Sequence, residues 1–200
     1  MTSVRYAVEG WTDEPVAEKL IRLVGRSPIK TFIARGSSNL DPRVSGFNRA
    51  AAHSAWLVLR DLDRDLCPSH LTSTLLSGAS LAAGMCLRVP VRAVEAWLLA
   101  DADAVAEHFR ISPGRLPWAP DQEPNPKLSL VNACRRSRSR TIQRAMVPRQ
   151  GSGAVVGPEY SARIRHFAQT LWDPERAMLR SPSLMRSVDR MRAHVGAGAW

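Results

Sequence analysis

The chain has 200 residues, of which 44% are hydrophobic, and this suffices for one domain with a sizeable core or for one domain with a helical extension. No apolar run is long enough to span a membrane and the N-terminus lacks a signal-peptide pattern, so we expect a soluble, cytoplasmic protein. The three scattered cysteines form no CxxC pair, so we expect neither a disulfide framework nor a zinc site. The net charge of +10 would attract phosphate backbones by counterion release, although a GC-rich genome that encodes arginine explains the same balance without a nucleic-acid role.

The first half of the chain alternates strand patterns with helix patterns. Residues 4–8 alternate as in a strand, and a helical apolar face follows between the capping signals of Thr12 or Asp13 and the closing Gly25. A second strand is predicted over 29–34 and a short helix over 43–52. The continuous apolar run AWLVL at 55–59 is typical of a strand buried on both faces. A short helix at 70–77, a strand at 85–89 and a helix at 93–109 complete this half.

This rhythm predicts an α/β, Rossmann-like fold for residues 1–110, with a four-stranded, mainly parallel sheet flanked by helices. Five prolines between positions 113 and 126 interrupt the rhythm, so we place a boundary at 111 and expect residues 111–200 to form a C-terminal helical extension. Its helices are predicted over 127–136, 159–172, 174–180 and 182–195. Asp173 and Ser181 each precede a proline, which is a strong signal for a helix start.

Acidic residues follow two of the predicted strands. Glu9 follows the first strand, and the run at 55–59 is followed by Asp61, Asp63 and Asp65. Because ligands bind at the carboxyl ends of parallel strands, these side chains should meet at one edge of the sheet. On an extended backbone Asp61 and Asp63 would point to the same side and could hold one ion, with Asp65 as a further ligand. The pattern favours a Mg²⁺ or Mn²⁺ site over the alternative of a solvated turn beside a helix cap.

Glu95 is a further acidic candidate, because it lies in the first turn of the helix after the fourth strand. Spacing alone slightly favours a simpler role, in which the carboxylate interacts with the helix dipole. Asp101 and Asp103 lie further along this helix and are expected on the solvated surface.

A basic cluster in the second half could contact a nucleic-acid backbone. A run of charge is more often a solvated surface. The members of the cluster are Arg135, Arg136, Arg138, Arg140 and Arg144, of which Arg135, Arg136 and Arg138 are predicted to bind nucleic acid. Lys127 could stabilise charge on a phosphate, whereas a solvated lysine at a helix start is the simpler interpretation.

Taken together, the segment YAVEGWTDEP at 6–15 and the strand ending in DLDRD at 61–65 resemble a Toprim domain, the fold shared by topoisomerases, bacterial primases and OLD-type nucleases. The segment VRAVEAWLLAD at 91–101 is similar to a Toprim-like bacterial family of unknown function. So are three pieces of the tail, VGPEY at 156–160, WDPE at 172–175 and RSPSL at 180–184.

The resemblance implies a four-stranded Rossmann-like fold with Mg²⁺ held by Glu9, Asp61 and Asp63, and it adds Glu95 as a further acidic residue of the site. Such proteins are often encoded beside ATPases of the ABC or AAA type and are suspected of acting in phage defence. This chain has no ATPase motif, so such an ATPase would be a separate partner.

Three functions compete on these observations. The first is a Mg²⁺- or Mn²⁺-dependent nuclease that acts on DNA or RNA, with Glu9, Asp61, Asp63 and Glu95 as catalytic residues. The second is a non-catalytic nucleic-acid-binding or regulatory subunit of an ATPase complex. The third is a phosphatase of the haloacid-dehalogenase type with Asp61 as the nucleophile. Against the third, two strands precede the DxD, and Asp65 stands where that family has Thr or Val.

Overall fold

The computed structural model describes residues 2–200 and contains one sheet of four parallel strands. The strands are β1 (Ser3–Val8), β2 (Ser27–Ile33), β3 (Ala55–Leu59) and β4 (Met85–Arg88). Their order across the sheet is β2-β1-β3-β4, and each neighbouring pair is parallel. The α/β class and the four-stranded parallel sheet predicted from the sequence are therefore confirmed.

The strands separate two hydrophobic clusters, one on each face of the sheet. Leu57 and Leu59 of β3 belong to one cluster, whereas Trp56 and Val58 belong to the other. This alternation explains the continuous apolar run, because each residue of β3 is buried whichever face it points to.

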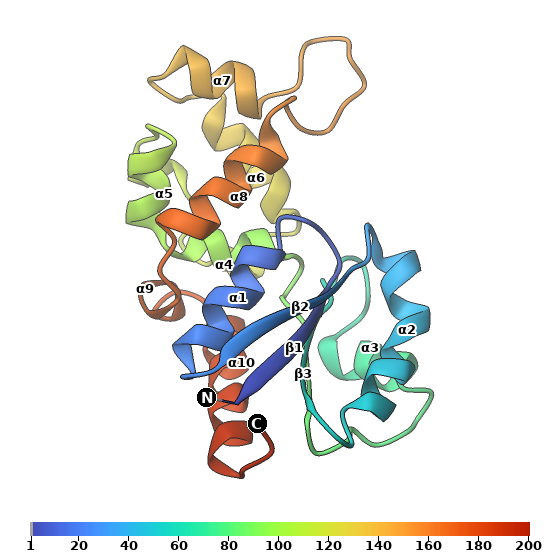
Figure 1. Ribbon diagram of the computed structural model, residues 1–200. Helices are drawn as coiled ribbons and strands as arrows, with labels where there is room; N and C mark the ends of the chain where they lie inside the picture. Colours follow the sequence, from blue (N-terminus) through green and yellow to red (C-terminus); the bar gives the residue numbers. More distant parts are fainter. Residues whose placement is uncertain (1) are drawn as a thin grey trace.

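Helices cover both faces of the sheet (Figure 1). One face is covered by α2 (Ser37–Ala50) and α3 (Pro68–Leu75), and the other by α1 (Glu14–Leu23), α4 (Val94–Ala100) and α10 (Pro182–Gly196). The remaining helices are α5 (Ala102–His108), α6 (Pro126–Cys134), α7 (Arg140–Met146), α8 (Tyr160–Thr170) and α9 (Pro174–Met178), with short 3₁₀ turns η1 (Pro113–Arg115) and η2 (Pro120–Gln122).

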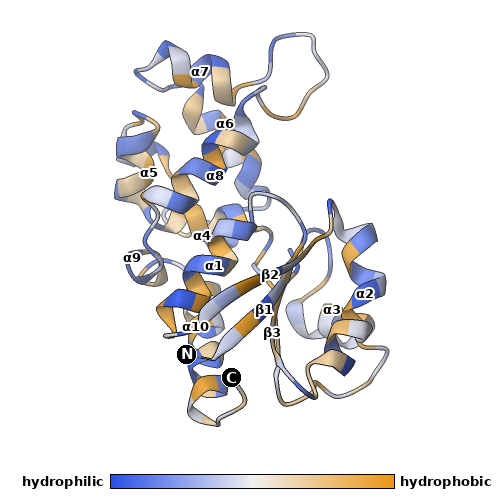
Figure 2. Cartoon of the chain, in the orientation of Figure 1, coloured by the Kyte–Doolittle hydropathy of each residue, from blue (hydrophilic) through white to orange (hydrophobic). Residues whose placement is uncertain are grey.

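Residues beyond 110 are helical, as predicted, but their side chains share the core of the sheet region. One hydrophobic cluster joins Leu57 of β3 to Phe167 of α8 and Val188 of α10. The indole of Trp97 donates to Ser183 Oγ at 2.7 Å, and the whole of α4 is buried, mostly in hydrophobic colours in Figure 2. The predicted division at residue 111 marks a change of secondary structure, and its status as a domain boundary stays a prediction.

Two predicted elements differ in detail. The helix predicted over 93–109 is broken at Asp101, which is buried rather than solvated. Its carboxylate accepts hydrogen bonds from Asp173 N at 2.8 Å and from Arg176 Nε at 3.0 Å, so a contact with a segment 72 residues away fixes the break. No helix was predicted between 136 and 159, yet Ser139 caps helix α7 within the basic cluster by accepting from Ile142 N at 3.4 Å.

Within residues 2–200, no helix combines the length and the apolar character that crossing a bilayer requires.

Candidate functional site, a carboxylate pocket

The carboxyl ends of β1 and β3 open onto a pocket of about 600 Å³, which we call the carboxylate pocket. The loop after β1 and the segment after β3 supply its acidic side chains, and the start of α6 closes it from the helical part of the chain. Its lining residues are Glu9, Asp61, Asp63, Arg64, Asp65, Arg92, Ala93, Pro124, Asn125, Pro126 and Lys127. Segments about 120 residues apart in the sequence therefore meet at the edge that binds ligands in parallel sheets.

Asp61 lines this pocket and is hydrogen-bonded to helix α4. Its Oδ1 accepts a hydrogen bond from Val94 N, at the first residue of α4, at 2.9 Å. Burial and the negative charges of Asp13 and Glu95, with smaller contributions from other acids, raise the pKa of Asp61 well above its ordinary value. An acid in this position is stabilised by gaining a proton or by a nearby cation.

Glu9 reaches the same pocket from the end of β1. Burial raises its pKa to about 7, the charge of Arg60 opposes this rise, and the charges of Asp63 and Asp13 add to it. Its Oε2 is buried and has no hydrogen-bond partner among the described residues; Arg60 Nε lies 3.8 Å away. Glu9 thus contributes a buried carboxylate oxygen that accepts no hydrogen bond to a site rich in negative charge.

The sequence pattern predicts Asp13 only as the cap of a helix. It is buried, and its Oδ2 accepts from Gly10 N at 2.7 Å, so it shapes the loop that carries Glu9. Burial and the charge of Glu95 raise the pKa of Asp13 to about 6, while its hydrogen bonds from Gly10 and Thr12 oppose the rise.

The buried guanidinium of Arg60 organises the outer acids. Its Nε and Nη2 contact the two carboxylate oxygens of Asp41 at 2.9 and 3.2 Å. It also lies 3.2 Å from Asp63 and 3.5 Å from Asp65. Although burial opposes its charged form, the hydrogen bonds and charge of Asp41, aided by the charge of Glu9, raise the pKa of Arg60. The single guanidinium group of Arg60 therefore forms ion pairs with Asp41, Asp63 and Asp65.

The expected extended geometry after β3 is wrong, and this changes the place of Asp63. The backbone of Asp63 has φ of 49°, in the left-handed region, and its N–H donates to Arg92 O at 2.8 Å. The chain thus turns after Leu62, and the half-exposed Asp63 carboxylate lies beside Arg60, whereas the Asp61 carboxylate is held by Val94 N.

Glu95 is buried on α4 and has two partners from the helical part of the chain. Tyr160 donates its hydroxyl to Glu95 Oε1 at 3.0 Å, and Lys127 Nζ lies 3.5 Å from the same oxygen. The charge of Glu95, opposed by burial and aided by Asp61 and Asp13, raises the pKa of Lys127. Lys127 is therefore paired with the acidic site instead of being free in solvent.

Asn125 and Pro126 explain why Lys127 stands at this position. Asn125 caps α6 by accepting from Leu128 N at 3.0 Å, and Pro126 is the first residue of the helix. The cap fixes the first turn of α6 beside the pocket, so the ammonium group of Lys127 reaches Glu95.

The donors of the carboxylate pocket suit a hard cation such as Mg²⁺ or Mn²⁺, because they are carboxylate oxygens and one of them has no partner. Across residues 2–200, however, no three His, Cys, Asp or Glu side chains are already gathered at metal-binding distances. The acids therefore do not form a ready-made ligand set: all four line the pocket, and Asp63 and Asp65 are engaged by Arg60.

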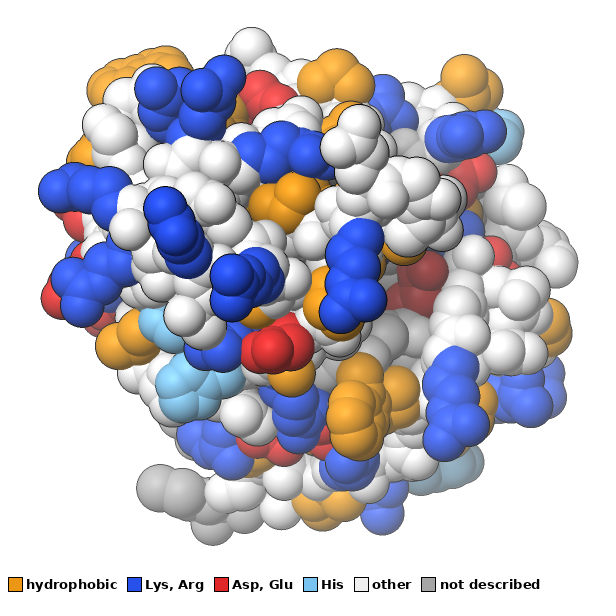
Figure 3. Space-filling view, turned by 90° about the horizontal axis from the view of Figure 1, so that it is seen from above, with side chains coloured by type: hydrophobic (Ala, Val, Ile, Leu, Met, Phe, Trp, Pro, Cys, Tyr) orange, Lys and Arg blue, Asp and Glu red, His pale blue; other side chains and the backbone are white. Residues whose placement is uncertain are grey.

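The predicted basic residues do not lie in the carboxylate pocket, with the exception of Lys127. Arg135 and Arg136 line a second pocket at the end of α6, and Arg138 lines a third beside Arg110. Figure 3 shows Lys and Arg side chains spread over the face that contains these helices, with an acidic side chain deeper between them.

The residues that the sequence did not single out for the site are Asp13, Arg60, Asp41 and Tyr160. Arg60 carried a usable signal, because it stands directly between a fully apolar strand and the first acid of DLDRD. Tyr160 carried none, since its contact with Glu95 joins residues 65 positions apart.

Comparisons of the chain with protein-family models, with curated proteins and with solved structures found no match. The Toprim resemblance therefore stays a prediction, and function has to be argued from the pocket itself.

Proposed function

We propose that this protein is a divalent-metal-dependent phosphodiesterase that cleaves a nucleic acid. The observation that carries the proposal is the gathering of Glu9, Asp13, Asp61 and Glu95 at the carboxyl edge of the sheet, with the pKa values of the first three raised. Structural ion pairs normally lower the pKa of a carboxylate. Carboxylates with raised pKa values in an open pocket are typical of functional sites.

In this proposal Glu9 and Asp61 would hold a Mg²⁺ or Mn²⁺ ion, with Asp63 available at the rim. A bound divalent cation supplies positive charge both to these carboxylates and to a phosphate group. Mg²⁺ needs few protein carboxylates because it retains several waters, so a partial ligand set is sufficient.

The protein's own groups would position the phosphate. Lys127 lines the pocket and can donate to a phosphate oxygen while it remains close to Glu95. Arg92 and Arg64 line the same pocket, and they can contact neighbouring phosphates. The hydrogen bond from Val94 N fixes the Asp61 carboxylate before any ligand arrives, so little rearrangement is needed.

The test is cleavage of plasmid DNA and of labelled DNA and RNA oligonucleotides with Mn²⁺, with Mg²⁺ and with EDTA. The wild-type protein should cleave at least one substrate only when a divalent cation is present. Asp61→Asn should lose at least about a hundredfold in rate, because it removes the charge but keeps the acceptor for Val94 N. The exposed Asp103→Asn is the matched control and should cleave like the wild type.

Two results would contradict the proposal. Cleavage that persists in Asp61→Asn would assign the activity to a contaminant or to another site. The absence of metal-dependent cleavage of every substrate, in a protein that still binds nucleic acid, would favour a non-catalytic role beside an ATPase.

A further inference from the structure

Four arginines surround a second pocket, of about 680 Å³, which we call the arginine pocket. Arg135 and Arg136 directly follow α6, Arg144 belongs to α7, and Arg149 belongs to the segment that follows α7. Gln143, Val147 and Pro148 complete the lining, so the pocket has a cationic rim and a partly apolar floor.

The turn between α6 and α7 holds this pocket in a fixed shape. Ser137 is buried, and its hydroxyl donates to Phe109 O at 2.7 Å and accepts from Ser139 N at 3.0 Å. Gln143 Nε2 donates to Ser137 O at 2.7 Å. The arginines therefore project from a scaffold that is anchored to the core.

The cations of the arginine pocket have no acidic partners. Among the described residues, no carboxylate lies within ion-pairing distance of any of the four guanidinium groups, and the one polar side-chain contact is Arg135 Nε to Asn132 Oδ1 at 3.3 Å. Four unpaired cations around one pocket repel one another, and an anionic ligand would relieve this repulsion.

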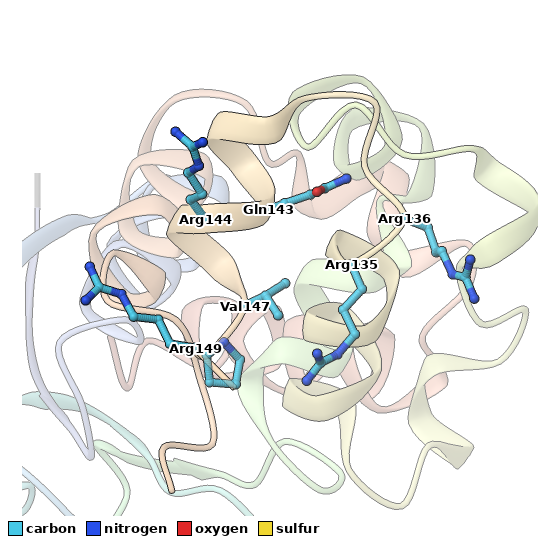
Figure 4. A pocket seen from close by; sticks show the side chains of 7 residues that line it. Arg135, Arg136, Gln143, Arg144, Val147 and Arg149 are labelled. Carbon is cyan, nitrogen blue, oxygen red and sulfur yellow. The ribbon is translucent and has the colours of Figure 1, made fainter. Parts of the chain in front are cut away.

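The directions of the side chains indicate which anion the pocket suits. In Figure 4, Arg144 and Arg149 extend to one side of the pocket, Arg136 extends to the opposite side, and Arg135 lies between them. Guanidinium groups that spread around a rim do not converge on one small ion. They suit a chain of phosphates, and the apolar floor formed by Val147 and Pro148 can receive a sugar or a base.

The two pockets are linked by a single helix. Lys127, in the carboxylate pocket, and Arg135, in the arginine pocket, stand at opposite ends of α6. Eight residues of helix correspond to about 12 Å, which is roughly three to four steps of a B-form strand. A nucleic-acid strand that passes Lys127 would thus reach Arg135 within a few nucleotides.

We propose that the arginine pocket binds the sugar–phosphate backbone of the nucleic-acid strand that the carboxylate pocket cleaves. This inference rests on the proposed function for the identity of the polyanion. It assigns binding to residues of α6, α7 and the following segment, separately from cleavage.

The test measures binding without cleavage, by fluorescence anisotropy of labelled DNA and RNA oligonucleotides in EDTA at several salt concentrations. The variant is Arg144→Gln/Arg149→Gln, and both side chains are exposed. The matched control, Arg186→Gln/Arg190→Gln on α10, removes the same charge from exposed arginines on another helix. Circular dichroism melting should show that both variants fold.

The pocket variant should bind at least about tenfold more weakly than the wild type, and the slope of log K against log salt should fall by about 1.8 for duplex DNA or about 1.4 for a single strand. The control should keep the wild-type slope. Equal effects of the two variants, or wild-type binding by the pocket variant, would overturn the inference. So would a wild-type protein that binds no nucleic acid.

Inorganic phosphate separates a polyanion site from a small-anion site. Inorganic phosphate should change the unfolding temperatures of the wild type and of the pocket variant by the same amount. A saturable increase in the wild type that the variant lacks would overturn the assignment to a nucleic-acid strand. If Asp61→Asn and the wild type bind alike but neither cleaves, the proposed function fails while the binding assignment stands.

Discussion

Glu9→Gln is expected to stabilise the protein at about pH 8 in the absence of metal, although it removes an ion pair. The pKa of Glu9 is raised from 4.5 to about 7 by burial and by neighbouring acids, and Arg60 only partly offsets them. The folded state therefore binds this proton more tightly than the unfolded state does. The contribution of Glu9 to stability is highest below its unfolded pKa and is lost as the pH rises through about 7.

The magnitude follows from the size of this shift. A change from 4.5 to about 7 corresponds to about 3 kcal/mol, at about 1.4 kcal/mol for each pKa unit. The Glu9 side chain is 18% exposed in an open pocket, so solvent screening reduces the expected gain to about 1–2 kcal/mol. For a chain of this size, that gain corresponds to about 2–8 °C in the unfolding temperature.

Thermal unfolding of the wild type, Glu9→Gln and the exposed control Glu107→Gln should be followed by circular dichroism in EDTA, at about pH 5.5 and about pH 8. The Glu9→Gln variant should unfold at a higher temperature than the wild type at the higher pH, and the difference should shrink at the lower pH. Equal destabilisation of Glu9→Gln at both pH values would refute the reasoning, because it would mean that the Arg60 ion pair outweighs the repulsion.

A divalent cation should reverse this order. At a Mn²⁺ concentration about a hundredfold above its dissociation constant, binding to the folded state alone stabilises by about 2.7 kcal/mol. The wild type should gain that amount at the higher pH, whereas Glu9→Gln should gain much less because it lacks one carboxylate. If Mn²⁺ raises the unfolding temperature of both proteins equally, Glu9 is not a ligand.

Two further predictions follow. Lys127→Met should lower the kcat of metal-dependent cleavage by at least about tenfold, because Lys127 is the cation that reaches Glu95 from α6. Lys127→Arg should stay partly active. Equal rates in the wild type and in Lys127→Met would contradict the role of Lys127. Gly84→Ala should lower the unfolding free energy by about 2–3 kcal/mol in urea, since its Cβ would lie 2.5 Å from Ser54 O and 2.6 Å from Ala51 O, whereas Gly114→Ala meets nothing within 4 Å and should change little.

The sheet could be predicted because each strand carries its signal locally. Burial on both faces demands an apolar residue at each position of β3, and that demand is visible in AWLVL. The break at Asp101 and helix α7 could not be placed in the same way. The first depends on hydrogen bonds to Asp173 and Arg176, and the second begins with a Ser139 cap inside a run of charge that resembles a solvated surface.

The same distinction applies to the carboxylate pocket. The proximity of Glu9 and Asp61 could be predicted from the sequence, because the carboxyl ends of parallel strands share one edge of the sheet. The position of Asp63 could not, since it depends on a left-handed residue that no local pattern required. The partners of Glu95 come from α6 and from Tyr160 at the start of α8, and only the tertiary fold brings those helices to α4.

The balance of charge within the carboxylate pocket supports the proposed metal ion. Asp41, Asp63 and Asp65 have Arg60, and Glu95 has Lys127. Asp61 has the hydrogen bond from Val94 N, and the closest cation to Glu9 is the already shared Arg60, at 3.8 Å. Glu9 and Asp61 thus have no cation of their own, although Lys127 also interacts with the charge of Asp61. In the proposed function, a divalent cation from solution would supply the positive charge that these two pocket acids lack.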